Sequence, residues 1–312
     1  MFSAAVGGFM YGVPAPSPAP PSSPTAGWFG GGRTLSTVDR ITYATDTATA
    51  TVRGPLSLAR YSLAATGNTT NGWYAGGKTP TTVSTVDRIT YATDTATASV
   101  RGPLSSSRYG AAATGNSTDG WFGGGNGTVS RVDRITFATD TATASVRGPL
   151  SSSVYSLAAT TDGTTYGWFG GGNSGPPTYV NVSTVARITY ATDTATASVR
   201  GPLSLDRYTL SATGTSNEGW YAGGSSGGAV SRIDRITYAT DTATASVRGP
   251  LNSARYYMAA STDNTTYGWY GAGYSGISTV QRITYATDTA TASVLGPLSE
   301  AKYDLAATSG IQ

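Results

Sequence analysis

RITYATDTATASVRGPLSSSRYGAAATGNSTDGWFGGG, residues 88–125, is one of six near-copies that make up most of the chain. Its first eleven residues recur with the starts about 47 residues apart. These starts are Arg40, Arg88, Arg134, Arg187, Arg235 and Arg282, with Phe in place of Tyr in the third copy. A Gly-Trp pair recurs as well, and its tryptophans are Trp28, Trp73, Trp121, Trp168, Trp220 and Trp269. Self-similarity at such a period is typical of a repeat architecture.

Each unit contains four short segments that favour β-strands. In one unit they are residues 61–66, 73–77, 84–93 and 95–101. β-Branched and aromatic residues dominate these segments, and an Asp turn and a Gly-Pro pair separate or end them. Four strands in 40 to 50 residues is typical of a propeller blade. The sequence therefore predicts an all-β, six-bladed β-propeller with four antiparallel strands per blade.

The ends of the repeat region predict how the ring closes. The first Gly-Trp segment has no clear inner strand before it, and the last inner segment, residues 303–308, has no Gly-Trp segment after it. We therefore expect residues 303–308 to pair with residues 28–32 and so complete one blade from both ends of the chain. An open or seven-bladed ring that uses residues 2–12 is the alternative.

Composition excludes several classes of function. The 312 residues include no cysteine and no histidine, which excludes disulfide frameworks, thiolate nucleophiles, Ser-His-Asp relays and histidine metal ligands. A net charge of +3 is too weak to indicate nucleic-acid binding, and no apolar run is long enough for a membrane helix. The recurrent Arg, Tyr and Asp residues occupy the same places in every copy, whereas an active site needs a unique cluster. We expect no enzymatic activity, no cofactor and no metal site.

The order of segments resembles a kelch repeat. The features that carry the resemblance are an Arg-led apolar strand, a strand that ends in Gly-Gly, a strand that ends near Tyr and a turn Asp, here residues 60–65, 73–77, 89–91 and Asp94. The resemblance covers residues 27–309 and implies the same propeller. One departure leaves the packing between blades open, because kelch repeats carry a Trp in the fourth strand, where this chain has Ala98 and Val100.

The repeated tryptophans and charges are interpreted as structural. We expect the six tryptophans to pack between blades, and the alternative is that they are platforms for sugars. Two series of arginines are expected to lie half-buried between blades, beside Asp or carbonyl groups. One series begins the repeated eleven-residue segments, and the other is Arg53, Arg101, Arg147, Arg200 and Arg248. A central arginine ring that binds an anion is the alternative. One aspartate also recurs in each repeat, and we expect these aspartates to be turn residues: Asp46, Asp94, Asp140, Asp193, Asp241 and Asp288.

Two connections vary between the copies, and they are expected on opposite faces of the ring. One joins the first and second strands of a blade, and the other joins the second and third. Loops often carry recognition, although drift without function is the alternative. The candidate recognition residues in the second-to-third connections are Lys78, Asn126, Tyr179, Asn181 and Tyr274.

The first 24 residues stand outside the repeat. Six prolines and no charge in residues 13–25 predict an extended, semi-rigid segment. We expect residues 1–24 to be an attachment segment and residues 25–312 to be the propeller, and the alternatives are a strap on the propeller itself or a signal peptide. The candidate anchoring residues are Phe2, Val6, Phe9, Met10 and Tyr11.

The tandem units also resemble repeat proteins of tailed bacteriophages, especially phages of cyanobacteria. The resemblance covers the ring and implies a structural protein of the virion, associated with tail or capsid and located on an extracellular particle. The expected partners are other virion proteins, through the N-terminal segment, and a host-surface glycan or receptor. The alternative is a glycan-binding, lectin-like propeller or a secreted bacterial surface adhesin.

Overall fold

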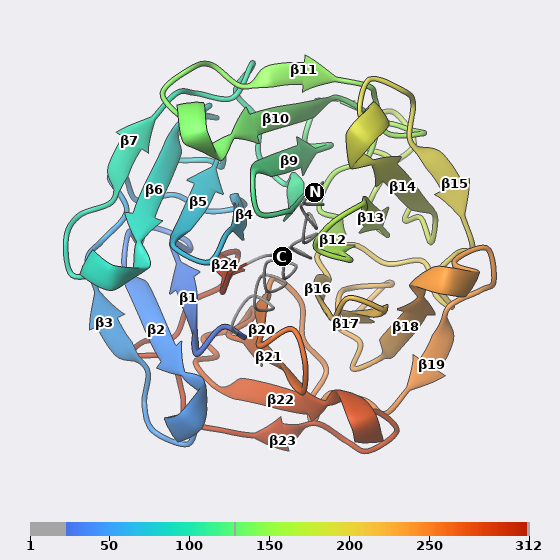
Figure 1. Cartoon of the computed structure of the whole chain (residues 1–312). Helices are drawn as coiled ribbons and strands as arrows, with labels where there is room; N and C mark the ends of the chain where they lie inside the picture. The colour runs from blue at the N-terminus through green and yellow to red at the C-terminus, as the bar shows by residue number, and fades with distance from the viewer. Residues whose placement is uncertain (1–22, 128, 311–312) are drawn as a thin grey trace, which may run out of the picture.

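The computed structural model describes residues 23–127 and 129–310, which form six four-stranded antiparallel sheets around one axis (Figure 1). Each sheet is a blade, so the predicted all-β, six-bladed β-propeller is confirmed. The alternative of a seven-bladed or open ring is wrong. The anchoring candidates Phe2, Val6, Phe9, Met10 and Tyr11 lie outside the described residues.

The two strands nearest the axis are short. The innermost strands are β4 (Ala64–Gly67), β8 (Ala112–Gly115), β12 (Ala158–Thr161), β16 (Ser211–Gly214), β20 (Ala259–Thr262) and β24 (Ala306–Thr308). The second strands are β1 (Ala26–Gly30), β5 (Asn71–Ala75), β9 (Asp119–Gly123), β13 (Tyr166–Gly170), β17 (Glu218–Ala222) and β21 (Tyr267–Gly271).

The outer half of each blade contains a 3-10 turn between its two strands. The third strands are β2 (Val38–Thr42), β6 (Val86–Thr90), β10 (Val132–Thr136), β14 (Val185–Thr189), β18 (Ile233–Thr237) and β22 (Val280–Thr284). The 3-10 turns are η1 (Tyr43–Thr45), η2 (Tyr91–Thr93), η3 (Phe137–Thr139), η4 (Tyr190–Thr192), η5 (Tyr238–Thr240) and η6 (Tyr285–Thr287). The outermost strands are β3 (Thr51–Arg53), β7 (Ser99–Arg101), β11 (Ser145–Arg147), β15 (Ser198–Arg200), β19 (Ser246–Arg248) and β23 (Ser293–Val294).

Both ends of the described chain contribute to one blade, as predicted. This blade 1 has the strand order β24-β1-β2-β3, and blades 2 to 6 follow in chain order from β4–β7 to β20–β23. In blade 1, β24 pairs with β1 through the registers Trp28↔Thr308, Phe29↔Ala307 and Gly30↔Ala306 (Figure 1). We call the contact between blades 6 and 1 the closing interface.

The predicted third strand is too long, because Tyr91 leaves the sheet. Residues 84–93 were expected to be extended, but β6 ends at Thr90 and Tyr91 begins η2. There the Tyr91 ring stacks on Trp28 of the preceding blade, with 3.9 Å between the ring centroids. The aromatic residue at this position therefore serves the packing between blades rather than the sheet.

The predicted inner and fourth strands are also too long. The inner strand of blade 2 begins at Ala64 rather than residue 61, because Ser62 has a left-handed φ of 53° that breaks the extended chain. The fourth strand begins at Ser99 rather than residue 95, since residues 94–96 continue the turn after η2.

The hydrophobic core lies between neighbouring blades. One cluster joins Trp73 and Val86 of blade 2 to Phe122 and Ile135 of blade 3, and similar clusters occur at the other interfaces. The Gly-Pro pairs close these interfaces tightly. A Cβ on Gly54 would collide with the backbone of Ala96, so this position requires glycine.

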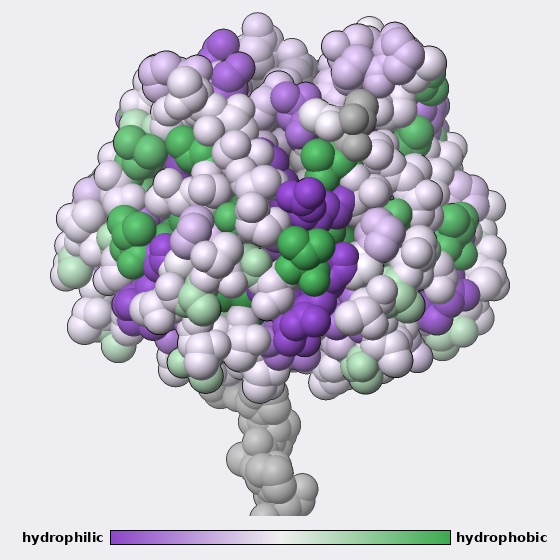
Figure 2. All heavy atoms as spheres, turned by 90° about the horizontal axis from the view of Figure 1, so that it is seen from above, coloured by the Kyte–Doolittle hydropathy of each residue, from purple (hydrophilic) through white to green (hydrophobic). Residues whose placement is uncertain are grey.

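The outer rim is mostly weakly polar, with scattered apolar and charged side chains, as the side view of Figure 2 shows. The apolar part includes one exposed valine from each outermost strand, namely Val52, Val100, Val146, Val199, Val247 and Val294. No helix in the described part of the chain is long and apolar enough to cross a membrane.

Candidate functional site

The ring has two faces that differ in what they carry. Innermost strands run from one face to the other, and their far ends lead to the first-to-second connections and, nearby, the 3-10 turns. The described chain begins at Ser23 and ends at Gly310 on this side, where Pro24 lies against Gly310. We call it the terminal face. The opposite face carries the second-to-third connections, so the predicted separation of the two connections is correct.

The six tryptophans lie inside the blade interfaces. Each is at most 7% exposed and stacks on the aromatic residue that opens the 3-10 turn of the next blade, with centroids 3.7–4.1 Å apart. In one example, Trp73 stacks on Phe137, and its indole N–H donates to Asp140 Oδ2 at 2.9 Å. The prediction of packing residues is confirmed, and the alternative of sugar platforms is wrong for these rings.

Both arginine series converge on the same aspartates. Asp140 accepts a hydrogen bond from Arg88 at 3.0 Å, and Arg101 Nε lies 3.5 Å from the same oxygen. This group of one Trp, two Arg and one Asp recurs at five interfaces, and the closing interface has Leu295 where the second Arg would be. The alternative of a central arginine ring is wrong. The turn aspartates are also more than turn residues, because each accepts a hydrogen bond from the tryptophan N–H of the preceding blade.

A second buried pair varies between blades. Four blades hold an ion pair with both side chains at most 1% exposed: Arg60–Asp87, Arg108–Asp133, Arg207–Asp234 and Lys302–Asp39. Blade 4 has Val154 and Ala186 at these positions, and both are buried in an apolar cluster. Blade 6 has Arg255 with Gln281, and Arg255 donates to backbone carbonyls instead. The acid is thus missing only where its basic partner is also changed or otherwise satisfied.

Six tyrosines, one from each blade, surround the channel on the face opposite the termini. They are Tyr61, Tyr109, Tyr155, Tyr208, Tyr256 and Tyr303, and all are half-buried. Their backbones hydrogen-bond to the first residue of the second-to-third connections, as in the paired bonds between Tyr61 and Lys78 at 2.8 and 3.0 Å. We call these residues the tyrosine ring and this side the tyrosine face.

The structure brings the predicted recognition residues to the tyrosine face. Lys78 places its ammonium 5.3 Å from the centre of the Tyr109 ring, and Asn126 N–H donates to Tyr109 O at 2.9 Å. Tyr274 stacks on Tyr256 with centroids 5.0 Å apart.

The recognition candidates of blade 4, Tyr179 and Asn181, both accept hydrogen bonds from the side chain of Asn173. Asn173 donates from its side chain to Tyr179 O at 3.1 Å and to Asn181 Oδ1 at 3.0 Å, and its backbone pairs with Tyr155. Tyr179 itself is 61% exposed.

A ring of backbone hydrogen bonds surrounds the mouth of the channel at the tyrosine face. Each residue that follows a ring tyrosine donates its N–H to the carbonyl of its counterpart in a neighbouring blade, at 2.6–3.0 Å. All six have φ between 53° and 67°, the left-handed region. We call them the mouth ring: Ser62, Gly110, Ser156, Thr209, Tyr257 and Asp304.

Asp304 is the one carboxylate in the mouth ring. It accepts a hydrogen bond from Ser62 Oγ at 2.6 Å, and it borders a cavity of about 90 Å³ with Ser62 and Tyr257. Desolvation by burial raises the pKa of Asp304 from 3.8 to about 6, while Ser62 and the charge of Arg33 oppose this rise. Burial also raises the pKa of Tyr257, with the charge of Asp304 adding to it.

Aromatic side chains accumulate at one part of the tyrosine face. Tyr274 lies 5.3 Å from Tyr303 in an edge-to-face arrangement, and Tyr257 lies 6.3 Å from Tyr303. Arg33 donates to Tyr303 Oη at 2.7 Å, and its guanidinium lies 5.7 Å from the Tyr61 ring centre. This tyrosine cluster, Tyr256, Tyr257, Tyr274 and Tyr303, spans the closing interface.

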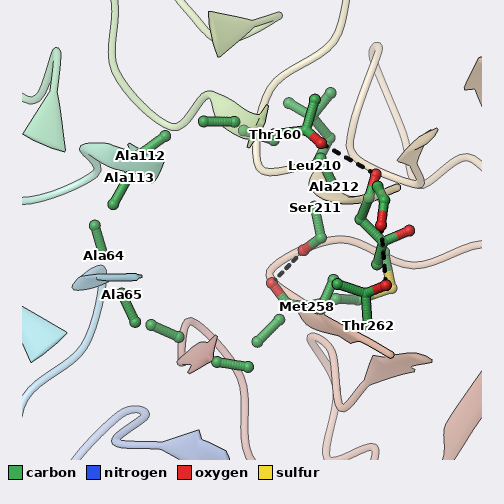
Figure 3. Close-up of a pocket in the computed structure, with 18 of the residues that line it drawn as sticks. Ala64, Ala65, Ala112, Ala113, Thr160, Leu210, Ser211, Ala212, Met258 and Thr262 are labelled. Atoms are coloured by element: carbon green, nitrogen blue, oxygen red, sulfur yellow. Dashed lines mark hydrogen bonds between the residues drawn. The ribbon is translucent and has the colours of Figure 1, made fainter. Parts of the chain in front are cut away.

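Small residues line the channel behind the mouth. Its cavity of about 110 Å³ is walled mainly by alanine and threonine from the innermost strands, and Ser211 Oγ donates to Met258 O in the wall (Figure 3). Among residues 23–127 and 129–310, no three carboxylates gather in a way that could hold a metal ion. The tyrosine face instead presents phenol rings, hydroxyls, the Asp304 carboxylate and stacked cations, which bind by stacking and hydrogen bonding.

Sequence reasoning missed the tyrosine ring and Asp304. The tyrosines repeat as regularly as the buried tryptophans, so repetition alone could not separate them. One signal was available. Gly110 stands in one copy where the others have Ser, Thr, Tyr or Asp, and a glycine there points to a left-handed residue between the tyrosine and the strand.

The fold and its two faces define a six-bladed β-propeller, an architecture that fits a binding or structural role. No protein-family model matches the chain, and no curated protein matches it. Among solved structures, the chain is similar to the one described as "Structure of YjhT", with a TM-score of 0.69. The similarity covers 90% of this chain and 99% of that chain at 11% sequence identity, and it therefore concerns the fold alone.

Proposed function

We propose that this chain is a non-enzymatic structural protein of a tailed-phage virion, associated with tail or capsid, which displays its tyrosine face to the host surface. The observation that carries the proposal is the polarity of the ring. The described chain starts at Ser23 on the terminal face, and all five recognition candidates lie on the opposite face. Attachment through residues 1–24 would leave the tyrosine face free.

Two features of the sequence support the virion setting. The tandem kelch-like units resemble repeat proteins of tailed phages, as described above. The chain is also free of cysteine and only 12% charged, against about 25% in an average domain, which suits an extracellular particle. In this setting the partners are other virion proteins and a receptor or glycan on the host.

A lectin-like propeller or a secreted bacterial adhesin is the second candidate, and the tyrosine ring favours it. Half-buried tyrosines present a flat apolar ring together with a hydroxyl, which is the combination that suits sugars and protein partners alike. This candidate uses the same face but does not need residues 1–24 as an anchor.

The deciding experiment compares the full chain with a chain that begins at Thr25. We expect both to melt at the same temperature, because the 24 strands of the six described blades all lie between Ala26 and Thr308. Mass spectrometry of purified particles should detect the full chain and not the shortened one. Absence of the full chain from virions, or normal incorporation of the shortened one, would contradict the proposal. A Val100→Thr variant on the outer rim is the matched control and should be incorporated normally.

A further inference from the structure

The closing interface breaks the sixfold symmetry of the tyrosine face. Five of the mouth-ring residues are uncharged, and Asp304 alone is acidic. Tyr257 is the one aromatic residue in that ring, and Tyr274 is the aromatic residue at the start of a second-to-third connection. Repeated positions maintain the ring, whereas these departures from the repeat all fall at one place.

The side chains gathered there can contact both the apolar C–H surface and the hydroxyl groups of a sugar. The Tyr274 ring lies 5.0 Å from that of Tyr256 and 5.3 Å from that of Tyr303, measured between centroids, and Tyr274 is 43% exposed. A pyranose can place its C–H side on such rings. Asp304 and Ser62 lie beside them at the mouth, where a carboxylate and a hydroxyl can bond to sugar hydroxyls.

The charges favour a neutral ligand. Arg33 is already bonded to Tyr303 and lies over tyrosine rings, and its charge also acts on the carboxylate of Asp304. Lys78 is likewise stacked on Tyr109 in another part of the ring. The site therefore has no group of free cations to bind an anionic polymer.

The cavity at the mouth gives the ligand an orientation. It has a volume of about 90 Å³, and Ser62, Tyr257 and Asp304 are among the residues that line it, so a substituent of the sugar that enters it meets the polar groups of the mouth ring. The sugar ring would rest on the tyrosine cluster with a hydroxyl or hydroxymethyl group in the mouth.

We propose that the tyrosine cluster, together with Asp304 and Ser62, binds the end of a neutral saccharide, one per propeller. This rests on the proposed function only in the sense that the tyrosine face is displayed outward. It adds the class of ligand and a single site in place of six equivalent ones.

The test uses saturation-transfer NMR with the methyl glycosides of glucose, galactose, mannose, N-acetylglucosamine and rhamnose, and with methyl glucuronide as the anionic comparator. At least one neutral glycoside should receive saturation on its C–H side and bind at one per chain by titration calorimetry. Tyr274→Ala and Tyr303→Ala should weaken it at least tenfold, and Asp304→Asn about tenfold. Tyr274 is exposed, so its variant keeps the fold even if Tyr303→Ala does not.

The control is Tyr166→Ala, a half-buried tyrosine that stacks on Arg187 at the terminal side of blade 4, and binding should stay within twofold. No binding by any neutral glycoside, or binding by methyl glucuronide alone, overturns the ligand class. A loss in Tyr155→Ala as large as in Tyr303→Ala overturns the single site. Particle incorporation of Tyr274→Ala is measured separately, so failure here and failure of the virion role give different results.

Discussion

The blade interfaces and the tyrosine face use repeated aromatic residues in opposite ways. At the interfaces, each tryptophan is buried and its N–H has a partner that repeats with it, an aspartate in the next blade. On the tyrosine face, each tyrosine is half-buried, and its neighbours change from Lys78 to Asn126 to Tyr274. A repeated residue whose polar group has a repeated partner therefore belongs to the framework. A repeated residue with changing neighbours belongs to the surface that can diverge.

Removal of residues 300–312 is expected to have the largest effect on the framework. This deletion takes away β24 and also Lys302, the partner of buried Asp39. Blade 1 then exposes an unpaired edge, and the ring has no closing interface. We expect the loss of a cooperative melting transition by circular dichroism. The chain without residues 311–312 is the control, and an unchanged melting temperature in the longer deletion would show that the ring closes by other means.

Trp121→Ala should be the most damaging single substitution of the two aromatic sets. It leaves a cavity against Tyr190 and deprives Asp193 of a donor. Loss of a large buried aromatic side chain typically costs about 3–5 kcal/mol of unfolding free energy. Chemical denaturation measures this loss of unfolding free energy. The comparison is Tyr179→Ala, which removes an exposed aromatic side chain and should stay within about 0.5 kcal/mol of the parent. Equal effects of the two substitutions would erase the distinction between interface and face.

The sequence predicted the framework because the framework repeats. Six copies of one strand pattern indicated six blades, and the incomplete first and last units indicated closure by β24 and β1. The partner of each tryptophan could not be predicted in the same way. Trp73 and Asp140 are 67 residues apart, and an Asp after a Thr is satisfied locally as a turn residue.

The recognition residues of this face were predicted, but the tyrosine ring was missed for a conformational reason of which Gly110 is the one sign in the sequence. A left-handed residue, such as Ser62 after Tyr61, lies between each ring tyrosine and its inner strand and interrupts the extended chain there. Serine, threonine and tyrosine rarely adopt this conformation, so their presence gives no sign of it. The backbone ring around the mouth imposes it, and that ring exists only once the six blades have assembled.

The buried pair of blade 2 offers a test of how much variation the framework tolerates. Asp87→Ala leaves the guanidinium of Arg60 buried without its carboxylate, which should cost about 3 kcal/mol. The double variant Arg60→Val with Asp87→Ala copies the apolar pair of blade 4 and should stay within about 1 kcal/mol of the parent. Denaturant titration of both variants makes the comparison. If the double variant is no better than the single one, the two positions are not coupled as the blades suggest.

Asp304 should give the smallest effect, a pH dependence that arises on the tyrosine face rather than in the framework. Its pKa of about 6 in the folded chain lies above the usual value near 4, so the folded state holds the proton more tightly than the unfolded state. The extra stability is present below about pH 4 and is lost as the pH rises to about 6.

The groups that face this carboxyl are Arg33, Ser62 and Tyr257, and only Arg33 carries a charge in that range. Because Asp304 is only half-buried, we expect the change to be about 1–2 kcal/mol. Thermal unfolding of the parent and of Asp304→Asn from about pH 3.5 to about pH 7 measures it, because this range begins below the unfolded-state pKa and ends above the shifted one. The difference between the two curves should fall between about pH 4 and about pH 6 and then level off. A flat difference would place Asp304 in contact with water at the mouth, where its carboxylate would bind ligands without any cost to the fold.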